Sequence, residues 1–324
     1  MKISKKIASA LVLGALVAAG GGWVLARQHA TAQARDLIDG FLIREGVSDK
    51  VTYADISASP FGSVSLLGVT MTLSPDVVFR ATSVDVSDIA FQGGELRKAR
   101  VSISSADVPV LAMARADRYN QALRAAVSLG YTSLRGDVSL LLDYDDQRQS
   151  LLLETSGTVG DAGGWTARVR VEGIDPSIVS MARRMASSRD VNPLAFMGSA
   201  MQNMDMLFRI ALAEADVTID NSGIRRRERE IVATDVPRTG EASAQRHPPL
   251  DPTALIRAGM TPEAARMSAT AAGVWMKDGG RLRMVTGLAR PLPLFKRGNG
   301  FAPILPAFDT TESFLTMTKA TISN

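Results

Sequence analysis

Beyond residue 51, hydrophobic side chains recur at every second position, between serines and threonines. Val64, Leu66, Val69 and Met71 follow this spacing. A period of two sends alternate side chains to opposite faces of a β-strand, so the pattern predicts a strand with one apolar face. Gly68 stands where the alternation slips by one position, and we expect a β-bulge there.

Two more strands are expected directly after the first. The Ser-Pro-Asp sequence at residues 74–76 and the glycine pair at residues 93–94 are typical of turns. They separate the first strand from further alternating segments at residues 78–86 and 99–103. Short strands joined by short turns predict an antiparallel meander.

The rest of the chain mixes hairpin strands with helices. Further strands are predicted over residues 133–144, 149–159, 164–173, 210–219, 281–288 and 314–322. Hydrophobic residues at helical spacing and helix-start signals predict helices over residues 30–45, 107–129, 175–206 and 261–276. The resulting fold class is α+β, in which an N-terminal transmembrane helix precedes antiparallel β-sheets with packed helices.

The transmembrane helix is predicted at residues 7–26, which carry no charged side chain. A run of this length spans about 30 Å, the thickness of a bilayer's hydrocarbon core. The lysines that precede the run predict a cytoplasmic N-terminus and a translocated body. The anchor residues are Ile7, Leu11, Leu13, Leu16, Val17, Trp23 and Leu25, and the topology residues are Lys2, Lys5 and Lys6.

The charge pattern therefore predicts a single-pass membrane protein with a translocated body and with the lipid bilayer as partner of residues 7–26. The absence of cysteine fits a bacterial envelope protein, for which this topology means an inner-membrane anchor and a periplasmic body. Cleavage of a signal peptide is the alternative, because Ala-Thr-Ala at residues 30–32 fits a cleavage site and residues 20–22 are glycines. The body would then be released into the periplasm. The predicted domains are residues 1–28 (cytoplasmic tip and anchor), 29–105 (helix and first meander) and 106–324 (α+β body).

Composition and charge exclude several classes of function. The chain has no cysteine, which excludes disulfides, thiol catalysis and thiolate metal sites. Its net charge of +4 is scattered rather than gathered in one basic stripe with aromatic residues, so no nucleic-acid partner is expected. The run of arginines at residues 225–227 is the exception, and Glu228 and Glu230 offset it.

Few side chains could carry catalysis, and none belongs to a known motif. His29 follows the predicted anchor, and His247 lies in a proline-rich segment. Because neither has a nucleophile-elbow serine or a paired metal-binding spacing, both are interpreted as surface histidines. Asp216 and Asp220 are a candidate carboxylate pair for a glycosidase, although a turn at the strand end is the simpler interpretation. We predict no catalytic residue, no metal and no cofactor.

Three acidic residues fall in the register of a calcium-binding loop. Asp143, Asp145 and Glu154 occupy its first, third and twelfth positions. Arg148 stands where such a loop needs a glycine, and the residues after it suit a strand. We therefore predict a hairpin turn rather than a calcium site.

One segment close behind the apolar run carries a family resemblance. The sequence Ser-Ala-Ser-Pro-Phe-Gly-Ser-Val-Ser-Leu-Leu-Gly-Val-Thr-Met at residues 57–71 resembles the start of AsmA-like envelope proteins. Residues 134–173 resemble the YdgA-like periplasmic proteins. The resemblance implies an exported, curved sheet attached to the inner membrane, with a part in envelope lipid traffic or outer-membrane homeostasis. It carries over no functional residue.

The anchor, the alternating strands and the missing catalytic motifs predict a membrane-anchored periplasmic protein that is not an enzyme. Its expected role is to bind a lipid or to contribute to cell-envelope homeostasis. Two alternatives stay open: a scaffold or assembly factor that binds another envelope protein, and a hydrolase with an unrecognised carboxylate site such as Asp216 and Asp220. The methionines of the predicted helix over residues 175–206 are interpreted as core residues, with a methionine-lined lipid groove as the alternative: Met181, Met185, Met197, Met201 and Met204.

Overall fold

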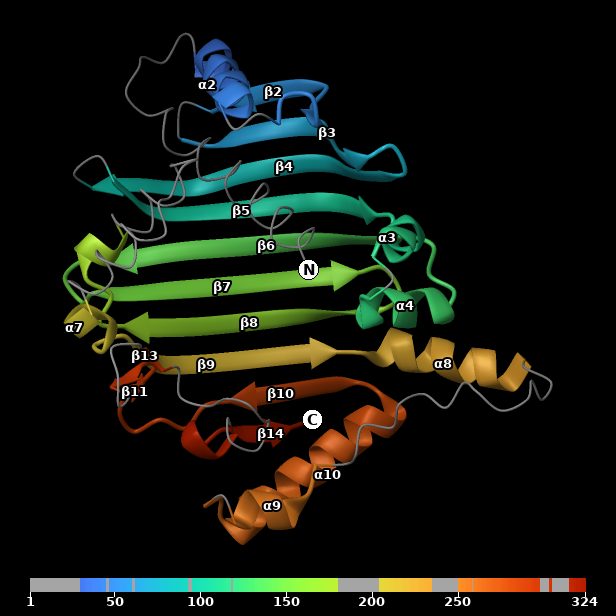
Figure 1. Ribbon diagram of the computed structural model, residues 1–324, viewed down its shortest axis with the longest axis vertical. Coiled ribbons are helices and arrows are strands. Elements are labelled where there is room, and N and C mark those ends of the chain that lie inside the picture. The colour runs from blue at the N-terminus through green and yellow to red at the C-terminus, as the bar shows by residue number, and fades with distance from the viewer. Residues whose placement is uncertain are drawn as a thin grey trace. The chain divides into compact units, whose positions relative to one another are not determined.

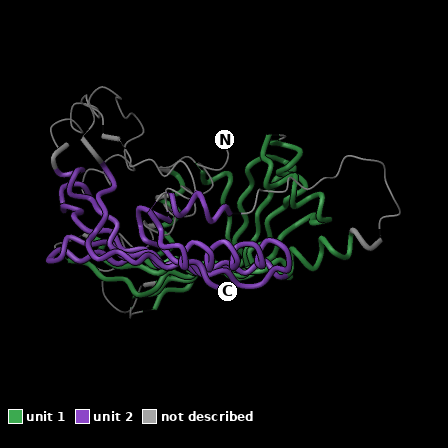
Figure 2. The backbone as a smooth tube through the Cα atoms, turned by 90° about the horizontal axis from the view of Figure 1, so that it is seen from below, with its two compact units in different colours: residues 1–142, 155–164, 223–236 green, residues 143–154, 165–222, 237–324 purple. Residues whose placement is uncertain are grey.

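The computed structural model describes residues 30–44, 47–59, 62–92, 95–117, 119–179, 204–234, 250–257, 259–297, 303–304 and 315–324. The chain divides into two compact units, which Figure 2 shows in different colours. Unit 1 comprises Met1–Leu142, Thr155–Gly164 and Gly223–Val236, and unit 2 comprises Asp143–Glu154, Trp165–Ser222 and Pro237–Asn324. Three strands supply residues to both units: β6 (Leu134–Asp145), β7 (Ser150–Val159) and β8 (Gly163–Glu172).

Unit 1 contains an antiparallel sheet whose main strands follow the order of the chain (Figure 1). β1 (Val51–Thr52) and β2 (Asp55–Ala58) both pair with β3 (Val64–Ser74), which pairs with β4 (Val77–Gln92), and β4 pairs with β5 (Glu95–Val108). This arrangement confirms the predicted meander. The other elements of unit 1 are α2 (Ala30–Arg44), α3 (Val110–Ala116), α4 (Gln121–Ser128) and nearly all of α8 (Ser222–Thr234).

The strand register places hydrophobic and polar side chains in alternate rows across β2, β3, β4 and β5. One row contains Ile56, Leu66, Val84 and Ile103, and the next contains Ser57, Ser65, Asp85 and Ser102. Neighbouring rows point to opposite faces of a sheet, so this sheet has one apolar face and one polar face. The prediction made from the period of two is therefore confirmed.

The irregularity expected at Gly68 lies elsewhere. Along the β3–β4 ladder the register runs evenly past this residue and shifts only between Thr72 and Ser74. Gly68 instead has a φ of +59° and packs closely on Ala54, where an added Cβ would lie 3.0 Å from the alanine Cβ. Glycine is needed here for the left-handed backbone and for the close approach of the segment that links β1 to β2.

Helix α2 covers part of the apolar face of this sheet (Figure 1). Its buried residues recur every four positions, as expected for a helix with one apolar stripe. They form a core with three buried strand residues, and the whole cluster is Ala34, Ile38, Leu42, Ile56, Val64 and Val86. The helix predicted over residues 30–45 is thereby confirmed.

The helix predicted over residues 107–129 is a strand end followed by two short helices. β5 runs as far as Val108, and α3 ends at Ala116. Asn120 then begins a new helix, because its side chain accepts a hydrogen bond from the backbone N–H of Leu123 at 3.2 Å. A cap inside a helical pattern thus divides it into two helices.

Unit 2 contains the neighbouring strands β8, β9, β10 and β14, in that order. β10 runs antiparallel to β9 and to β14, while the short β11 also pairs with β9 and β12 pairs with β13. The strands predicted over residues 210–219 and 281–288 are confirmed as β9 and β10. The elements of unit 2 are α7 (Met204–Leu207), β9 (Ala211–Asp220), α9 (Pro252–Arg257), α10 (Pro262–Asp278), β10 (Arg281–Val285), β11 (Leu292–Pro293), β12 (Lys296–Arg297), β13 (Pro303–Ile304) and β14 (Thr321–Ser323).

Helix α10 anchors a second core in unit 2. Thr261 caps the helix by accepting a hydrogen bond from the backbone N–H of Ala264, and Pro262 opens its first turn. These are the signals from which the helix was predicted. This core contains Ala265 of α10 itself, together with Leu255, Leu315, Ala320 and Ile322.

No helix in the part of the chain that the structure describes is long and apolar enough to cross a membrane. The helix predicted at residues 7–26, with its anchor and topology residues, lies outside that part. Helix α2, the first one described, spans only about 22 Å and carries Arg35, Asp36 and Asp39. For the residues that the structure describes, the predicted fold class is therefore corrected to an antiparallel sheet with packed helices, among which no helix can span a membrane. The predicted signal anchor and single-pass inner-membrane location are corrected with it.

Candidate functional site

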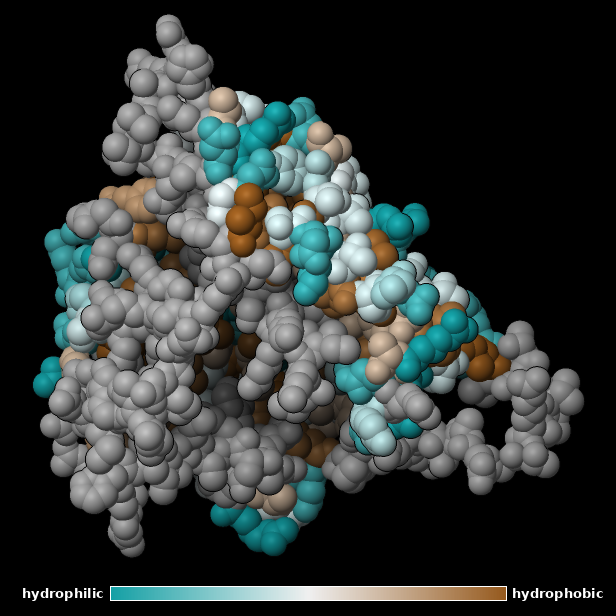
Figure 3. Space-filling model, turned by 45° about the horizontal axis from the view of Figure 1, so that its top comes forward, coloured by the Kyte–Doolittle hydropathy of each residue, from teal (hydrophilic) through white to brown (hydrophobic). Residues whose placement is uncertain are grey.

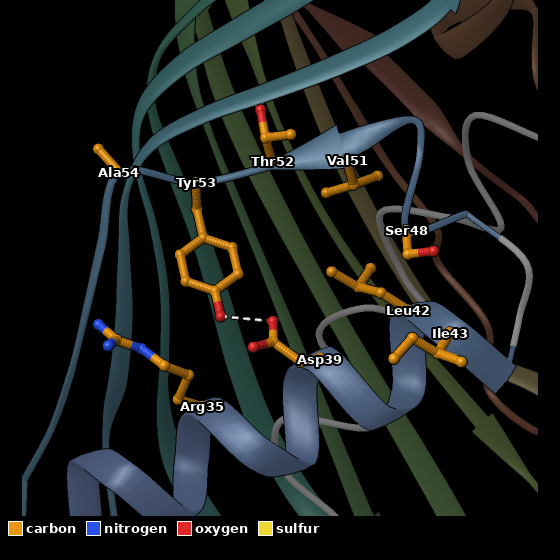
Figure 4. A pocket seen from close by; sticks show the side chains of 9 residues that line it. All are labelled: Arg35, Asp39, Leu42, Ile43, Ser48, Val51, Thr52, Tyr53 and Ala54. Atoms are coloured by element: carbon orange, nitrogen blue, oxygen red, sulfur yellow. Dashed lines mark hydrogen bonds between the residues drawn. The ribbon is translucent and has the colours of Figure 1, made fainter.

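A cleft opens between α2 and β1 with the segment that follows it, in unit 1 (Figure 4). Its volume is about 530 Å³. All of its lining belongs to unit 1, so the cleft is a property of one compact unit. The lining comes from α2, from the turn after it, from β1 and from the segment that joins β1 to β2. It consists of Arg35, Asp39, Leu42, Ile43, Ser48, Val51, Thr52, Tyr53 and Ala54.

Helical spacing explains which side chains α2 presents to the cleft. One stripe of the helix is buried in the core of unit 1. The neighbouring stripe, displaced by one residue, consists of Arg35, Asp39 and Ile43, and all three are exposed. Along the helix the stripe passes from a cation through an anion to a hydrophobic side chain. The cleft consequently has a charged end and an apolar end.

The charged end is organised around Tyr53 (Figure 4). Its phenol Oη donates a hydrogen bond to Asp39 Oδ1 at 2.6 Å. Burial, followed by this hydrogen bond and the negative charge of Asp39, raises the pKa of Tyr53 to about 12. Arg35 Nη2 forms an ion pair with Asp55 Oδ1 at 3.3 Å. The phenol therefore keeps its proton at neutral pH, and that proton stays directed at Asp39.

The apolar end leaves hydrophobic surface uncovered. Ile43 is 66% exposed, whereas Leu42 beside it is buried and Val51 is half-buried. In the space-filling view of Figure 3, hydrophobic and hydrophilic residues lie side by side on the described surface. An isoleucine that is two-thirds exposed at the rim of a cleft provides apolar area that a ligand can remove from water.

A second, smaller cleft of about 230 Å³ lies near the polar row of the same sheet. Its central group is the carboxylate of Asp85, which accepts hydrogen bonds from Ser65 Oγ at 2.5 Å and from Ser83 Oγ at 2.6 Å. Both carboxylate oxygens thus have partners on β3 and β4. The cluster stabilises the pairing of these two strands.

The structure separates the candidate carboxylates Asp216 and Asp220. They lie four residues apart on β9, and a strand places such residues about 13 Å apart. That exceeds the separation of about 6.5–9.5 Å in an inverting glycosidase. Asp216 accepts hydrogen bonds from Arg283 at 3.0 and 2.6 Å, and Asp220 accepts one from the backbone N–H of Ser222 at 2.9 Å.

These hydrogen bonds act on the protonation of both carboxyls. The bond from Arg283 lowers the pKa of Asp216, and the backbone bond from Ser222 lowers the pKa of Asp220. A general acid of a glycosidase needs a raised pKa. Asp220 instead holds the turn that leads into α8, in agreement with the simpler interpretation of this residue.

Acidification is expected to weaken unit 2 through Asp216. Because the folded-state pKa of Asp216 is lowered, its contribution to the free energy of unfolding is complete above its unfolded pKa of about 3.9 and is lost as the pH falls through the folded value. Unfolding followed between pH 6 and pH 2 should therefore show a larger loss of stability for the wild type than for Asp216→Asn. Asp76→Asn, at an exposed turn of unit 1, is the control. Parallel curves for the wild type and Asp216→Asn would contradict the expectation.

The segment in the calcium register contains a hairpin turn between β6 and β7, as predicted. Asp145 Oδ1 accepts hydrogen bonds from the backbone N–H groups of Gln147 and Arg148 at 2.9 and 3.1 Å. Glu154 lies on β7 and pairs with Arg168 at 2.8 Å. Throughout the described ranges, no three His, Cys, Asp or Glu side chains gather in a way that could hold a metal ion.

The arginine run at residues 225–227 lies on α8, a helix that sequence reasoning missed. Each arginine has a carboxylate partner: Glu228 for Arg225, Glu230 for Arg226 and Asp161 for Arg227. Arg227 also lies over the ring of Tyr131, 4.1 Å from its centroid. Spacings of three and four between opposite charges are typical of an exposed helix and could have predicted α8. The charge of the run is offset within the fold, as its glutamates indicated.

Several residues singled out from the sequence lie outside the described part of the chain. They are the anchor and topology residues, both histidines, and Met181, Met185, Met197 and Met201. Conversely, sequence reasoning did not single out the cleft beside α2. The available signal was the second stripe of the helix, at Arg35, Asp39 and Ile43.

No protein-family model matches this chain, and no curated protein matches it either. The resemblance to AsmA-like and YdgA-like proteins therefore stays a prediction. The geometry of the cleft beside α2 is the remaining basis for a functional proposal.

Proposed function

We propose that this protein is a non-enzymatic binding protein for an amphipathic, lipid-like ligand, and that the cleft beside α2 is its binding site. The observation that carries the proposal is the order of the side chains along the cleft, from Arg35 and Asp39 to Ile43. An amphipathic ligand needs a polar and an apolar contact at the same time, and one stripe of the helix supplies both. The volume of about 530 Å³ is within the range of about 300–1,000 Å³ for small-molecule sites.

The two ends of the cleft contribute differently to binding. Each buried methylene group contributes about 0.8 kcal/mol, so about five methylenes against Ile43 and its neighbours contribute about 4 kcal/mol. An ion pair at a solvent-exposed position contributes about 0–1 kcal/mol. The apolar end therefore supplies most of the affinity, and the charged end supplies selectivity among head groups.

Replacing Ile43 by aspartate is expected to weaken ligand binding at least about tenfold, because a charged side chain removes the apolar contact and costs more than about 1.4 kcal/mol. The full chain, freed of co-purified lipid, is titrated with a fluorescent single-chain phospholipid, and the dissociation constant is measured by anisotropy. Ile256→Asp is the matched control, since Ile256 is 38% exposed on a helix of unit 2. Undetectable binding by the wild type, or equal affinity of the wild type and Ile43→Asp, would contradict the proposal.

The scaffold alternative has less support. A partner that adds a strand needs a long, open sheet edge. β1 and β2 have only two and four residues, and β14 has three. At β14 the backbone N–H of Ile322 already donates to Ser268 Oγ of α10 at 3.3 Å. Such edges offer few backbone groups to a partner strand.

A further inference from the structure

The charged end of the cleft presents two opposite charges one helical turn apart. Arg35 and Asp39 stand four residues apart on α2, and both line the cleft (Figure 4). At this spacing two helix side chains are neighbours, with about 5–6 Å between their Cβ atoms. A ligand that occupies the cleft therefore meets a cation and an anion together.

The hydrogen bond from Tyr53 decides what Asp39 can bind. Oδ1 of Asp39 accepts a hydrogen bond from the phenol of Tyr53, which keeps its proton at neutral pH because its pKa is raised. The ionised carboxylate offers no proton of its own, so its second oxygen acts only as an acceptor. A ligand group that meets Asp39 must therefore donate, and a primary ammonium, with three N–H donors and a positive charge, fits this requirement.

Arg35 is the cationic group of the cleft and can bind an anionic part of the ligand. Its guanidinium carries five N–H donors, and its Nη2 lies 3.3 Å from Asp55 Oδ1. The side chains of this pair are 51% and 63% exposed, and exposed pairs of this kind are weak. A phosphate that enters the cleft can therefore share or replace Asp55 as the partner of Arg35, in the forked geometry that guanidinium groups favour.

The charge balance selects against a head group that is only anionic. Arg35 contributes +1, while Asp39 and Asp55 contribute −1 each, so these three groups sum to −1 at neutral pH. We infer that the ligand has a zwitterionic head group, whose primary ammonium binds Asp39 and whose phosphate binds Arg35. This inference rests on the proposed function and names the class of head group that the same site takes.

The inference predicts an order of affinities among single-chain phospholipids that differ only in the head group. The wild-type chain is titrated with the ethanolamine, choline and glycerol forms of one acyl length, and also with free phosphoethanolamine. The ethanolamine form is expected to bind about tenfold more tightly than the glycerol form, which lacks the cation. The choline form should fall between them, because its quaternary ammonium has no N–H donor.

Variants of Asp39 and Arg35 test the two charged contacts of the cleft one at a time. Asp39→Asn should abolish the preference for ethanolamine over choline, and Arg35→Gln should weaken binding of both zwitterionic forms. Asp36→Asn is the matched control, because Asp36 is exposed on the same helix and does not line the cleft. Thermal unfolding monitored by circular dichroism verifies that each variant keeps the fold of the wild type.

Each outcome of this titration has a distinct meaning. Equal affinity for all three head groups, or an ethanolamine preference that survives Asp39→Asn, would overturn the zwitterionic head group and leave the lipid-binding proposal standing. No binding of any single-chain phospholipid would overturn both. Free phosphoethanolamine that binds as tightly as the acylated form would support the head-group site and overturn the amphipathic ligand.

Discussion

Replacing Ile56 by alanine is expected to lower the free energy of unfolding by about 2–5 kcal/mol, the cost of removing a large aliphatic side chain from a packed core. Ile56 is 2% exposed and lies in the cluster that joins α2 to β2, β3 and β4. The cavity left behind would loosen α2, which carries one wall of the cleft. Chemical unfolding followed by circular dichroism measures the loss of stability, and titration with a single-chain phospholipid should show weaker binding.

Ile219→Ala is the matched control for this prediction. Ile219 is 41% exposed on β9 of unit 2, where truncation of a partly exposed side chain typically changes stability by about 0.5 kcal/mol. If Ile56→Ala were no more destabilising than this control, α2 would not be held by the core cluster. The cleft would then lack a rigid wall, and the proposed site would lose its structural basis.

Replacing Gly223 by alanine is expected to destabilise unit 1 by about 3 kcal/mol, at the upper end of the usual cost of overpacking. Gly223 stands at the start of α8, and a Cβ there would overlap the backbone carbonyl of Asp161. A backbone group cannot rotate away as a side chain does, so α8 must shift. The shift would break the hydrogen bond from Ile224 N–H to the Ala162 carbonyl (3.1 Å) and the ion pair between Arg227 and Asp161 (3.3 Å).

Gly273→Ala tests the same chemical change where nothing opposes it. Gly273 lies within α10, and an added Cβ would meet no atom within 4 Å. Glycine in a helix interior costs about 0.5–1 kcal/mol relative to alanine, so this variant is expected to be stabilised by that amount. Thermal unfolding should therefore move in opposite directions for the two variants. A decrease for Gly273→Ala, or no decrease for Gly223→Ala, would contradict the packing described for these helices.

Local patterns predicted much of the fold. The alternation at Val64, Leu66 and Met71 predicted β3, and the pair Thr261 and Pro262 predicted the start of α10. Both patterns act within a few residues, through the period of a strand or the capping of a helix. Where two local signals competed, the prediction was wrong: the apolar spacing over residues 107–129 indicated one helix, and the cap at Asn120 divides it.

Charge pairing along α8 was a local signal that a search for hydrophobic periodicity does not detect. Helix α8 has few apolar residues, so a search for an apolar stripe passed over it. Its arginines and glutamates nevertheless stand three and four residues apart, as in Arg225 with Glu228 and Arg226 with Glu230. The membrane helix is the opposite case, because apolar length alone suggested it. It was predicted at residues 7–26, outside the described ranges, and no helix within those ranges can span a membrane.

The candidate site depended on contacts between separate elements. Tyr53 meets Asp39 from 14 residues away, and Asp216 meets Arg283 from 67 residues away. A carboxylate's role follows from its partner: the same residue type is a hydrogen-bond acceptor for a phenol in one place and an ion-pair partner in another. No sequence pattern contained either pairing, so Asp216 was considered for catalysis while Asp39 was not considered at all.

Period and capping, which act over a few residues, therefore defined the antiparallel meander, the helices α2 and α10 and the apolar face of the sheet from the amino-acid order alone. The absence of cysteine in the sequence likewise excluded disulfides and thiol chemistry. The packing of α2 against β2 and β3 decided where a cleft opens, and the hydrogen bond between Tyr53 and Asp39 decided which charges face it. Burial and distance between chain-distant groups create such a site, and they exist only once the chain has folded.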